Sequence, residues 1–151
     1  MKRGLVNFLI TITVLVCLFT FSFGCFGTYK DVSSGDKIEF SNLTEDEVES
    51  YFSKIKFTHD EDRSGDIYTK ITFKGETKGY SGYSYYNCSV YCSIEYSYLS
   101  DSGSYLTAND NISIDVSSNG SGSTKKSVTV GYRNVTDFKF SFTVSGYVVK
   151  K

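Results

Sequence analysis

The residue group best suited to chemistry is an acidic stretch that could bind a cation. Its oxygen-bearing candidates stand at alternate positions and are Asp60, Asp62, Ser64 and Asp66. Calcium loops place such ligands around a glycine turn, here Gly65, and complete the shell with a bidentate Glu at the twelfth position. The twelfth position here is Ile71, which supplies no ligand. The stretch is therefore predicted to be an acidic hairpin loop, and a weak calcium-binding module is the alternative.

Two cysteines, Cys88 and Cys92, lie four residues apart in a stretch of alternating apolar and polar residues. In an extended strand this separation is roughly 13 Å, which is beyond the reach of a disulfide. The alternation favours two thiols that point inward and are buried separately, whereas a bridge between them would need a loop or bulge. Two thiols and the single His59 are too few for a structural zinc site, so no metal or other cofactor is expected.

The sequence offers little for catalysis. His59 is the only histidine, and the chain contains no Gly-x-Ser-x-Gly, His-Glu-x-x-His or phosphate-loop motif. Its closely spaced carboxylates fall in acidic stretches that are predicted to be exposed, where nothing would perturb their titration. The chain is therefore predicted not to be an enzyme.

A tyrosine-rich segment, residues 79–87, is the candidate binding site. Its aromatic members are Tyr80, Tyr83, Tyr85 and Tyr86. The Tyr, Ser, Gly and Asn composition of this segment is that of antibody paratopes, in which tyrosine offers contact area at low entropic cost. Such a segment suits recognition of a protein or a glycan. The alternative is a tyrosine-lined turn that covers the rim of the domain.

The chain also carries an excess of N-glycosylation sequons. Seven asparagines, in a chain that is about one-quarter Ser or Thr, would give fewer than two sequons by chance. Five occur, at Asn42, Asn87, Asn111, Asn119 and Asn134. These asparagines are predicted to be glycosylated if the host modifies exported proteins.

The N-terminus has the pattern of an export signal. Lys2 and Arg3 precede an apolar run from residue 5 to residue 23, and small residues follow it. Residues 1–24 are therefore predicted to be a cleaved signal peptide, with an uncleaved anchor as the alternative because the run approaches the ~20 residues that span a bilayer. Residues 21–25 resemble a bacterial lipobox, which would make Cys25 a lipidated residue instead of a part of the signal. In either case the rest of the chain is expected outside the cytoplasm, anchored to the membrane or secreted.

The length and charge of the chain limit the number of domains beyond the signal and the kind of partner they can bind. The sequence has 151 residues, enough for one domain and not two. Seventeen Asp and Glu against sixteen Lys and Arg argue against a nucleic-acid partner held by bulk charge. Residues 25–36 are predicted to be a linker and residues 37–151 one domain. Acids dominate residues 31–66 and bases dominate the residues beyond, and the fold is expected to bring the two charges together.

The hydrophobic periodicity predicts which elements position these residues. Thr44 and Glu47 have the spacing of a capping box and begin a short predicted helix, residues 44–53. After it the period becomes two, which is typical of half-buried strands. The predicted strands are residues 67–74, 88–97, 112–116, 128–132 and 138–144, with shorter ones at 37–40 and 54–59. Turns are expected at residues 101–103, 109–111 and 117–123.

About seven strands separated by regular turns predict an all-β fold. The predicted architecture is an immunoglobulin-like antiparallel β-sandwich with one short N-terminal helix. The expected core residues are Val90, Ile94, Ile114, Val130, Phe140 and Phe142.

Residues 98–103, with the sequence Tyr-Leu-Ser-Asp-Ser-Gly, resemble the strand-and-turn signature of FxLYD domains. Residues 140–144 occupy the place of a later strand of that family, so the resemblance covers about residues 85–149. It implies a small β-sandwich of the kind found in extracytoplasmic lipoproteins, without a known catalytic site.

These observations predict a small exported module that binds an unknown extracellular protein or glycan at the cell surface. A structural envelope or spacer protein without a discrete ligand is the alternative. The exposed tyrosines distinguish the two, because a few aromatic residues usually dominate a recognition surface.

Overall fold

The computed structural model describes residues 34–64, 68–131 and 133–151, without the side chains of residues 64, 68 and 133. The predicted signal peptide, Cys25 and most of the predicted linker therefore lie outside the described residues. The elements in chain order are β1 (Lys37–Glu39), the 3-10 helix η1 (Phe40–Asn42), α2 (Glu45–Glu49), β2 (Phe52–Ser64), β3 (Tyr68–Gly79), β4 (Tyr83–Leu99), β5 (Tyr105–Val116), β6 (Gly122–Val130) and β7 (Arg133–Lys150).

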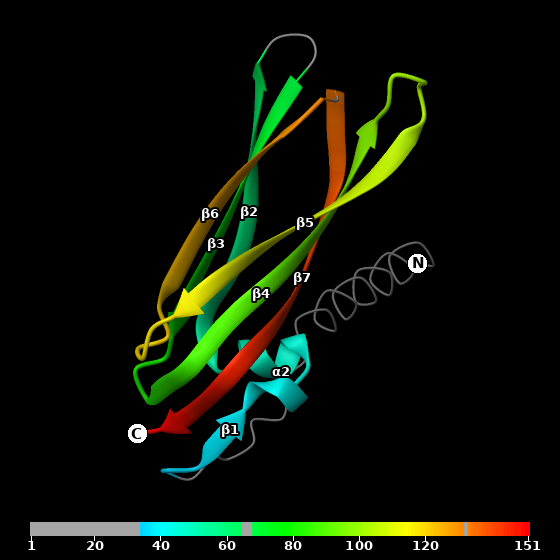
Figure 1. Cartoon of the computed structure of the whole chain (residues 1–151). Coiled ribbons are helices and arrows are strands. Elements are labelled where there is room, and N and C mark those ends of the chain that lie inside the picture. The colour runs from blue at the N-terminus through cyan, green and yellow to red at the C-terminus, as the bar shows by residue number, and fades with distance from the viewer. Residues whose placement is uncertain (1–33, 65–67, 132) are drawn as a thin grey trace, which may run out of the picture. The chain divides into compact units, whose positions relative to one another are not determined.

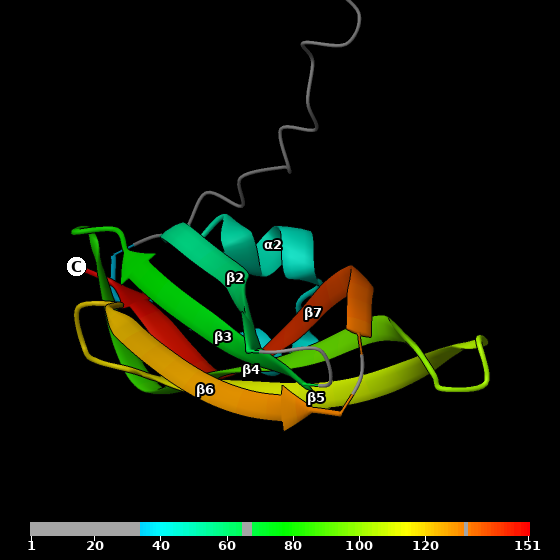
Figure 2. The ribbon, with the colours of Figure 1, turned by 90° about the horizontal axis from the view of Figure 1, so that it is seen from above.

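The described strands form two antiparallel sheets that pack face to face (Figures 1 and 2). One sheet has four strands in the order β1-β7-β4-β5, and the other has three in the order β2-β3-β6. The predicted all-β sandwich is confirmed. Its division into four and three strands is that of constant-type immunoglobulin sandwiches, with a different strand order, because β1 here pairs with β7 and not with β2.

The predicted helix forms where its capping box predicts and ends earlier than its apolar spacing suggests. The Thr44 side chain accepts a bond from the Glu47 backbone N–H, and the Glu47 carboxylate accepts from the Thr44 N–H at 2.8 Å. Ser50 closes the helix, and the chain enters β2 at Phe52. Phe52 and Ser53 were predicted as helical and lie in or beside the sheet, because β2 pairs with β3 from Phe52 onward. No helix among the described residues is long and apolar enough to cross a membrane.

Strand alternation builds the core between the sheets. Beyond residue 87 the buried inward residues of β4 are Cys88, Val90, Cys92, Ile94 and Tyr96. Ile71 and Phe73 of β3 in the opposite sheet are also buried, and so are Ile112 and Ile114, which lie beside Cys92 and Val90 on the neighbouring strand β5. Four predicted core residues, Val90, Ile94, Ile114 and Phe142, are buried as expected. Val130 and Phe140 are only partly buried, because Val130 lies on the edge strand β6 and Phe140 on the part of β7 that β1 does not reach.

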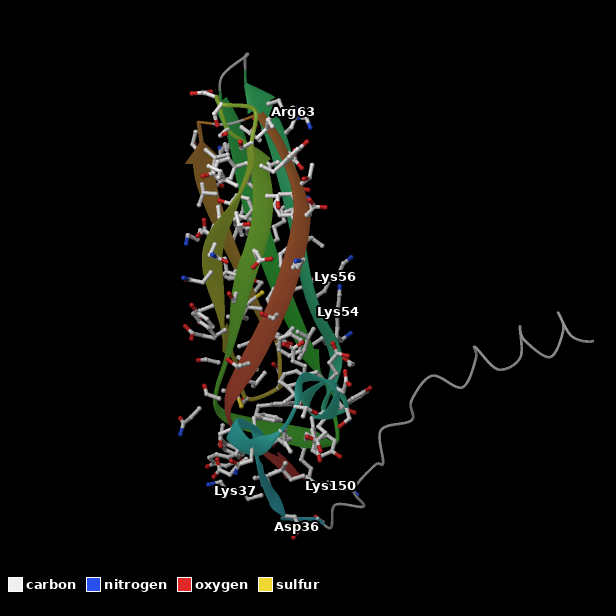
Figure 3. The ribbon with its side chains drawn as sticks, turned by 90° about the vertical axis from the view of Figure 1, so that its right-hand side faces the viewer. Asp36, Lys37, Lys54, Lys56, Arg63 and Lys150 are labelled. Carbon is white, nitrogen blue, oxygen red and sulfur yellow. The ribbon has the colours of Figure 1, made fainter. Side chains whose placement is uncertain are left out.

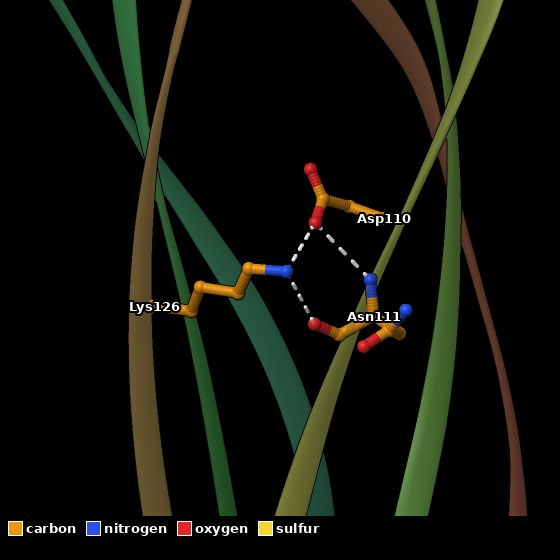
Figure 4. A network of polar contacts seen from close by, with 3 residues as sticks. All are labelled: Asp110, Asn111 and Lys126. Carbon is orange, nitrogen blue, oxygen red and sulfur yellow. Dashed lines mark hydrogen bonds and ion pairs between the residues drawn. The ribbon is translucent and has the colours of Figure 1, made fainter.

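A stretch predicted to be a turn, residues 109–111, lies inside β5. Asp110 points inward at the side of the sandwich, where Lys126 of β6 forms an ion pair with it at 2.5 Å (Figure 4). The Lys126 ammonium also donates to the Asn111 backbone carbonyl at 3.1 Å. Lys126 compensates the charge of this inward carboxylate and lies sixteen residues from it in the sequence. A turn prediction that considers only neighbouring residues does not include this partner. The pair joins the two sheets along the side formed by β5 and β6.

The opposite side of the sandwich is closed by aromatic rings and by one carboxylate. His59 stacks on Phe138 with ring centroids 3.6 Å apart, and Phe57 stacks on Phe140 at 6.3 Å. Glu45 of α2 accepts a bond from the Phe142 backbone N–H at 2.8 Å. β1 pairs only with residues Tyr147–Val149 of β7, so the edge of β7 that faces away from β4 has no paired strand at Phe142, and Glu45 accepts the hydrogen bond of a backbone N–H there.

Candidate functional site

The four tyrosines predicted to form one binding site do not lie on one surface. Tyr83 and Tyr85 are inward residues of β4 with 7% and 2% of their surface exposed. The Tyr85 hydroxyl donates to the Tyr51 backbone carbonyl and accepts from the Tyr80 backbone N–H. Burial raises the pKa of Tyr85 to about 12. These two residues belong to the core, so the expectation that they bind a ligand is corrected.

The alternation of inward and outward side chains along β4 shifts by one residue just after Tyr85. Asn87 has a positive φ of 50° and lies in a register shift between β4 and β7. Opposite it, Gly146 has a φ of 91°, and a Cβ there would come within 2.4 Å of the Asn87 carbonyl oxygen. This bulge lets Tyr85 and Cys88 both point inward while Tyr86 points outward.

Tyr86 therefore belongs to the outer face of the four-stranded sheet, together with tyrosines that the local composition did not indicate. Tyr91, five residues further along β4, is 48% exposed, and Tyr147 of β7 pairs with Tyr86. The Tyr86 and Tyr147 rings stack with centroids 5.2 Å apart, and the Lys37 ammonium lies 4.0 Å from the Tyr147 centroid. We name the outer face that carries Tyr86, Tyr91 and Tyr147 the tyrosine face.

The rest of the tyrosine face consists mainly of small polar residues. Tyr91 lies between Ser113 on β5 and Thr143 on β7. The rows on either side of it place outward Ser, Asn and Asp side chains at Ser89, Ser93, Asn111, Asp115, Ser141 and Ser145. Asp115 is the single charge in these three rows, and it accepts a bond from the Ser89 hydroxyl at 3.2 Å. The face therefore combines exposed rings with hydroxyl and amide groups at nearly neutral charge.

The strand period of the sequence indicates the exposure of Tyr91, whereas no local pattern indicates the place of Tyr147. Tyr91 stands at an outward position of the alternation that places Val90 and Cys92 inward, so its exposure follows from the strand period. Tyr147 follows the register shift at Gly146, and only the pairing of β4 with β7 brings it to Tyr86.

The predicted calcium ligands are not arranged as a loop. Asp60 and Asp62 lie within β2, in register with Thr72 and Lys70 of β3. Asp60 forms an ion pair with Lys74, which lowers the pKa of its carboxyl. Asp66 and the Ser64 side chain lie outside the described part of the molecule. Among the described residues no group of three or more His, Cys, Asp or Glu side chains is arranged to hold a metal ion.

The prediction of an acidic loop is wrong for Asp60 and Asp62, because pairing with the basic strand β3 stabilises acidic residues in an extended backbone. His59, the candidate third ligand for zinc, stacks on Phe138 and approaches Glu61 at 3.7 Å.

Cys88 and Cys92 are free thiols with 4% and 0% of their surface exposed, as the alternation predicted. Burial raises the pKa of the Cys88 thiol and raises the pKa of Cys92 to about 11. A thiol that stays protonated at neutral pH is a poor nucleophile and a poor metal ligand. These residues therefore act as small apolar members of the core.

All five sequon asparagines are exposed. At three of them the local structure gives a further reason for the residue type. Asn87 and Asn134 have positive φ values of 50° and 54°, which asparagine tolerates better than most residues. The Asn119 side chain accepts bonds from the Ser117 hydroxyl and the Ser121 backbone N–H within the turn between β5 and β6. Glycosylation at Asn42, Asn87, Asn111, Asn119 and Asn134 stays a prediction, and part of the sequon excess follows from turn and bulge geometry.

Comparison with protein-family models, with curated protein sequences and with solved structures found no match to this chain. The residues that resemble an FxLYD signature, 98–103, form the end of β4 and the turn that follows it. The resemblance stays a prediction. The class of the molecule is therefore defined by its fold, an all-β sandwich, and its function must be argued from its surfaces.

Proposed function

We propose that this chain is an exported, membrane-anchored β-sandwich module that acts by contact at the cell surface, and that its tyrosine face recognises a glycan. The observation that carries the proposal is the exposure of Tyr86 and Tyr91 on a sheet face of small hydroxyl and amide side chains, with the partly buried Tyr147 stacked on Tyr86. Tyrosine rings offer apolar faces on which sugar rings stack, and their hydroxyls add hydrogen bonds. Neighbouring Ser, Thr and Asn side chains supply donors and acceptors that suit a neutral polyhydroxylated ligand.

A glycan fits this face better than a protein does. Protein interfaces usually contain a desolvated apolar centre. Around Tyr91 the neighbouring outward residues are instead Ser113 and Thr143, whose hydroxyls would lose water without a matching partner. A sugar polymer replaces those lost bonds with its own hydroxyl groups. The functional consequence is adhesion or retention at a carbohydrate surface instead of catalysis.

Replacing Tyr86 and Tyr91 together with Ser should remove most glycan binding on an array of polysaccharides. Both rings are more than two-fifths exposed, so the domain should stay folded and lose contact area only. We expect a loss of tenfold or more, since a few aromatic anchors usually carry most of the binding energy. The matched control replaces Tyr80 and Tyr105, which are also exposed: Tyr80 lies between β3 and β4, and Tyr105 lies at the far end of β5, opposite Leu99 and away from the rows around Tyr91.

An equal loss of glycan binding in both double variants would show that the binding site is not on the tyrosine face. A wild-type chain that binds no glycan on the array would favour the structural spacer.

The proposed anchoring depends on the N-terminal signal and is tested separately. Mass spectrometry of the native N-terminal peptide should find a diacylated Cys25 and no residues 1–24. An intact Met1 on a chain recovered from the cytoplasm would contradict both export and anchoring.

A further inference from the structure

The outer face of the three-stranded sheet differs in chemistry from the tyrosine face, because lysines concentrate on it. Five exposed lysines from three strands lie within three adjacent rows, and they are Lys54, Lys56, Lys74, Lys78 and Lys125. Glu76 is the single carboxylate in the same rows. We name these six residues the lysine face. Figure 3 shows Lys54 and Lys56 extending from β2 toward the same side.

Two of the cross-strand pairs on this face join like charges. Lys54 is in register with Lys78, and Lys74 is in register with Lys125. Like charges placed directly opposite each other destabilise a sheet. Only part of this charge is compensated, because Lys54 pairs with Glu76 and Lys74 pairs with Asp60. Lys56, Lys78 and Lys125 have no ion-pair partner among the described residues.

Protection of sheet edges does not explain this arrangement fully. Lysine on an edge strand prevents pairing with other chains, and β2 and β6 are edge strands. Lys74, however, lies on the central strand β3 at a position that pairs with both β2 and β6. At this position lysine gives no edge protection and increases the repulsion, which suggests that an external anion offsets it.

The face also contains a hollow lined by donors. A cavity of about 310 Å³ lies among Lys56, Thr58, Lys74, Gly75, Glu76, Ser123, Thr124 and Lys125. Its lining therefore includes three lysines and, from outward positions of the same rows, the hydroxyl residues Thr58 and Ser123 beside one glutamate. Phosphate, sulfate and carboxylate oxygens accept hydrogen bonds from both kinds of donor.

We propose that the lysine face binds a linear anionic polymer, with phosphate or sulfate groups repeated along it. The lysines cover three rows and three strands, so a single small anion can contact only some of them. A flat anionic membrane suits the face less well, because Asp60 and Asp62 lie on the same outer surface in the next rows and would face the lipid phosphates. A polymer can cross the lysine rows and avoid these carboxylates.

This site lies on the sheet opposite the proposed glycan site and does not depend on it. The test measures binding of inorganic polyphosphate by calorimetry at low and moderate salt. The wild-type domain should bind, and the affinity should fall as salt rises, because ions screen exposed charges. Replacing Lys56 and Lys125 with Gln should weaken binding roughly tenfold or more.

The matched control is the Lys139→Gln, Lys151→Gln double variant, which removes the same charge from residues outside the lysine face. It should bind polyphosphate as the wild type does. Equal weakening in both double variants would show attraction by net charge alone and overturn the site. Binding to vesicles that contain anionic lipid, without binding to polyphosphate, would show that the lysine face binds a membrane. This result would overturn the proposal that it binds a polymer.

A stability measurement separates this proposal from a purely structural role of the lysines. Lys125→Gln removes one member of a like-charge pair, so its melting temperature should rise by roughly 1–3 °C while polyphosphate binding weakens. A lower melting temperature would show that Lys125 supports the fold and would contradict the proposal.

Discussion

Replacing Phe73 with Ala should unfold most of the domain or leave it only marginally stable. The Phe73 side chain has 0% of its surface exposed and packs between the sheets against Tyr96 and Phe138, at centroid distances of 6.0 and 6.3 Å. Truncating a fully buried phenylalanine costs about 3–5 kcal/mol, through lost burial and the cavity left behind. Domains of this size are stable by only about 5–15 kcal/mol. Urea denaturation of wild type and variant measures the loss directly.

Phe140→Ala is the informative comparison, because the sequence alone predicts that Phe140 is a core residue. Phe140 lies at the open side between β2 and β7, stacks on Phe57 and His59, and stays partly exposed. Its truncation should cost less than the truncation of Phe73, since water already reaches part of the ring and the neighbouring rings can move. A loss as large as that of Phe73 would mean that this side of the sandwich is closed more tightly than the structure shows.

Alternation predicted most of the core because it requires no knowledge of partners. In β4 the inward set from Cys88 to Tyr96 follows from a period of two and from the apolar character of those positions. The capping box at Thr44 and Glu47 is equally local, since both members lie within one turn. Such features are encoded within a few residues, and the structure confirms them.

Features that depend on distant partners were not predictable in the same way. Asp60, Asp62 and Asp110 are typical of turns by local composition. In the fold, Asp60 pairs with Lys74, and Asp110 pairs with Lys126. Lys74 lies on the paired strand β3 and Lys126 on β6 of the other sheet, so the compensating charges become visible only with the strand register and the packing of the sheets. Of these two pairs, Asp60–Lys74 joins the acidic part of the chain to the basic part.

The candidate binding site was mislocated for a related reason. Composition identifies a segment rich in tyrosine but not the side to which each ring points. The bulge at Asn87 and Gly146 decides this, because it sends Tyr85 into the core and leaves Tyr86 on the surface. The structure then adds Tyr91 from the same strand and Tyr147 from β7.

The two outer faces of the sandwich differ in composition. Serine, threonine and asparagine fill the outward positions around Tyr91, where charged residues are usual on an exposed sheet. The lysines gather on the other sheet, around Lys74. A module with a neutral face and a basic face could join a carbohydrate to an anionic polymer, as the two proposals together imply.

Replacing Gly120 with Ala should destabilise the domain by about 2–4 kcal/mol, through backbone strain and steric conflict together. Gly120 has a φ of 84°, which costs any residue with a Cβ. The added Cβ would also lie 2.4 Å from the Gly79 Cα and 2.7 Å from the Tyr85 ring. Since the first of these atoms belongs to the backbone, the turn between β5 and β6 would have to move away from the end of β3.

Gly103→Ala is the matched control for the part of the loss that comes from backbone strain. Gly103 has a similar φ of 78° in the turn between β4 and β5, and a Cβ there meets no atom within 4 Å. This variant should lose only about 1 kcal/mol, the cost of the backbone conformation. The difference between the two variants in urea denaturation therefore isolates the contact of Gly120 with Gly79. Equal losses would mean that the turn adapts at no cost, and that the packing of Tyr85 against this turn does not depend on a glycine.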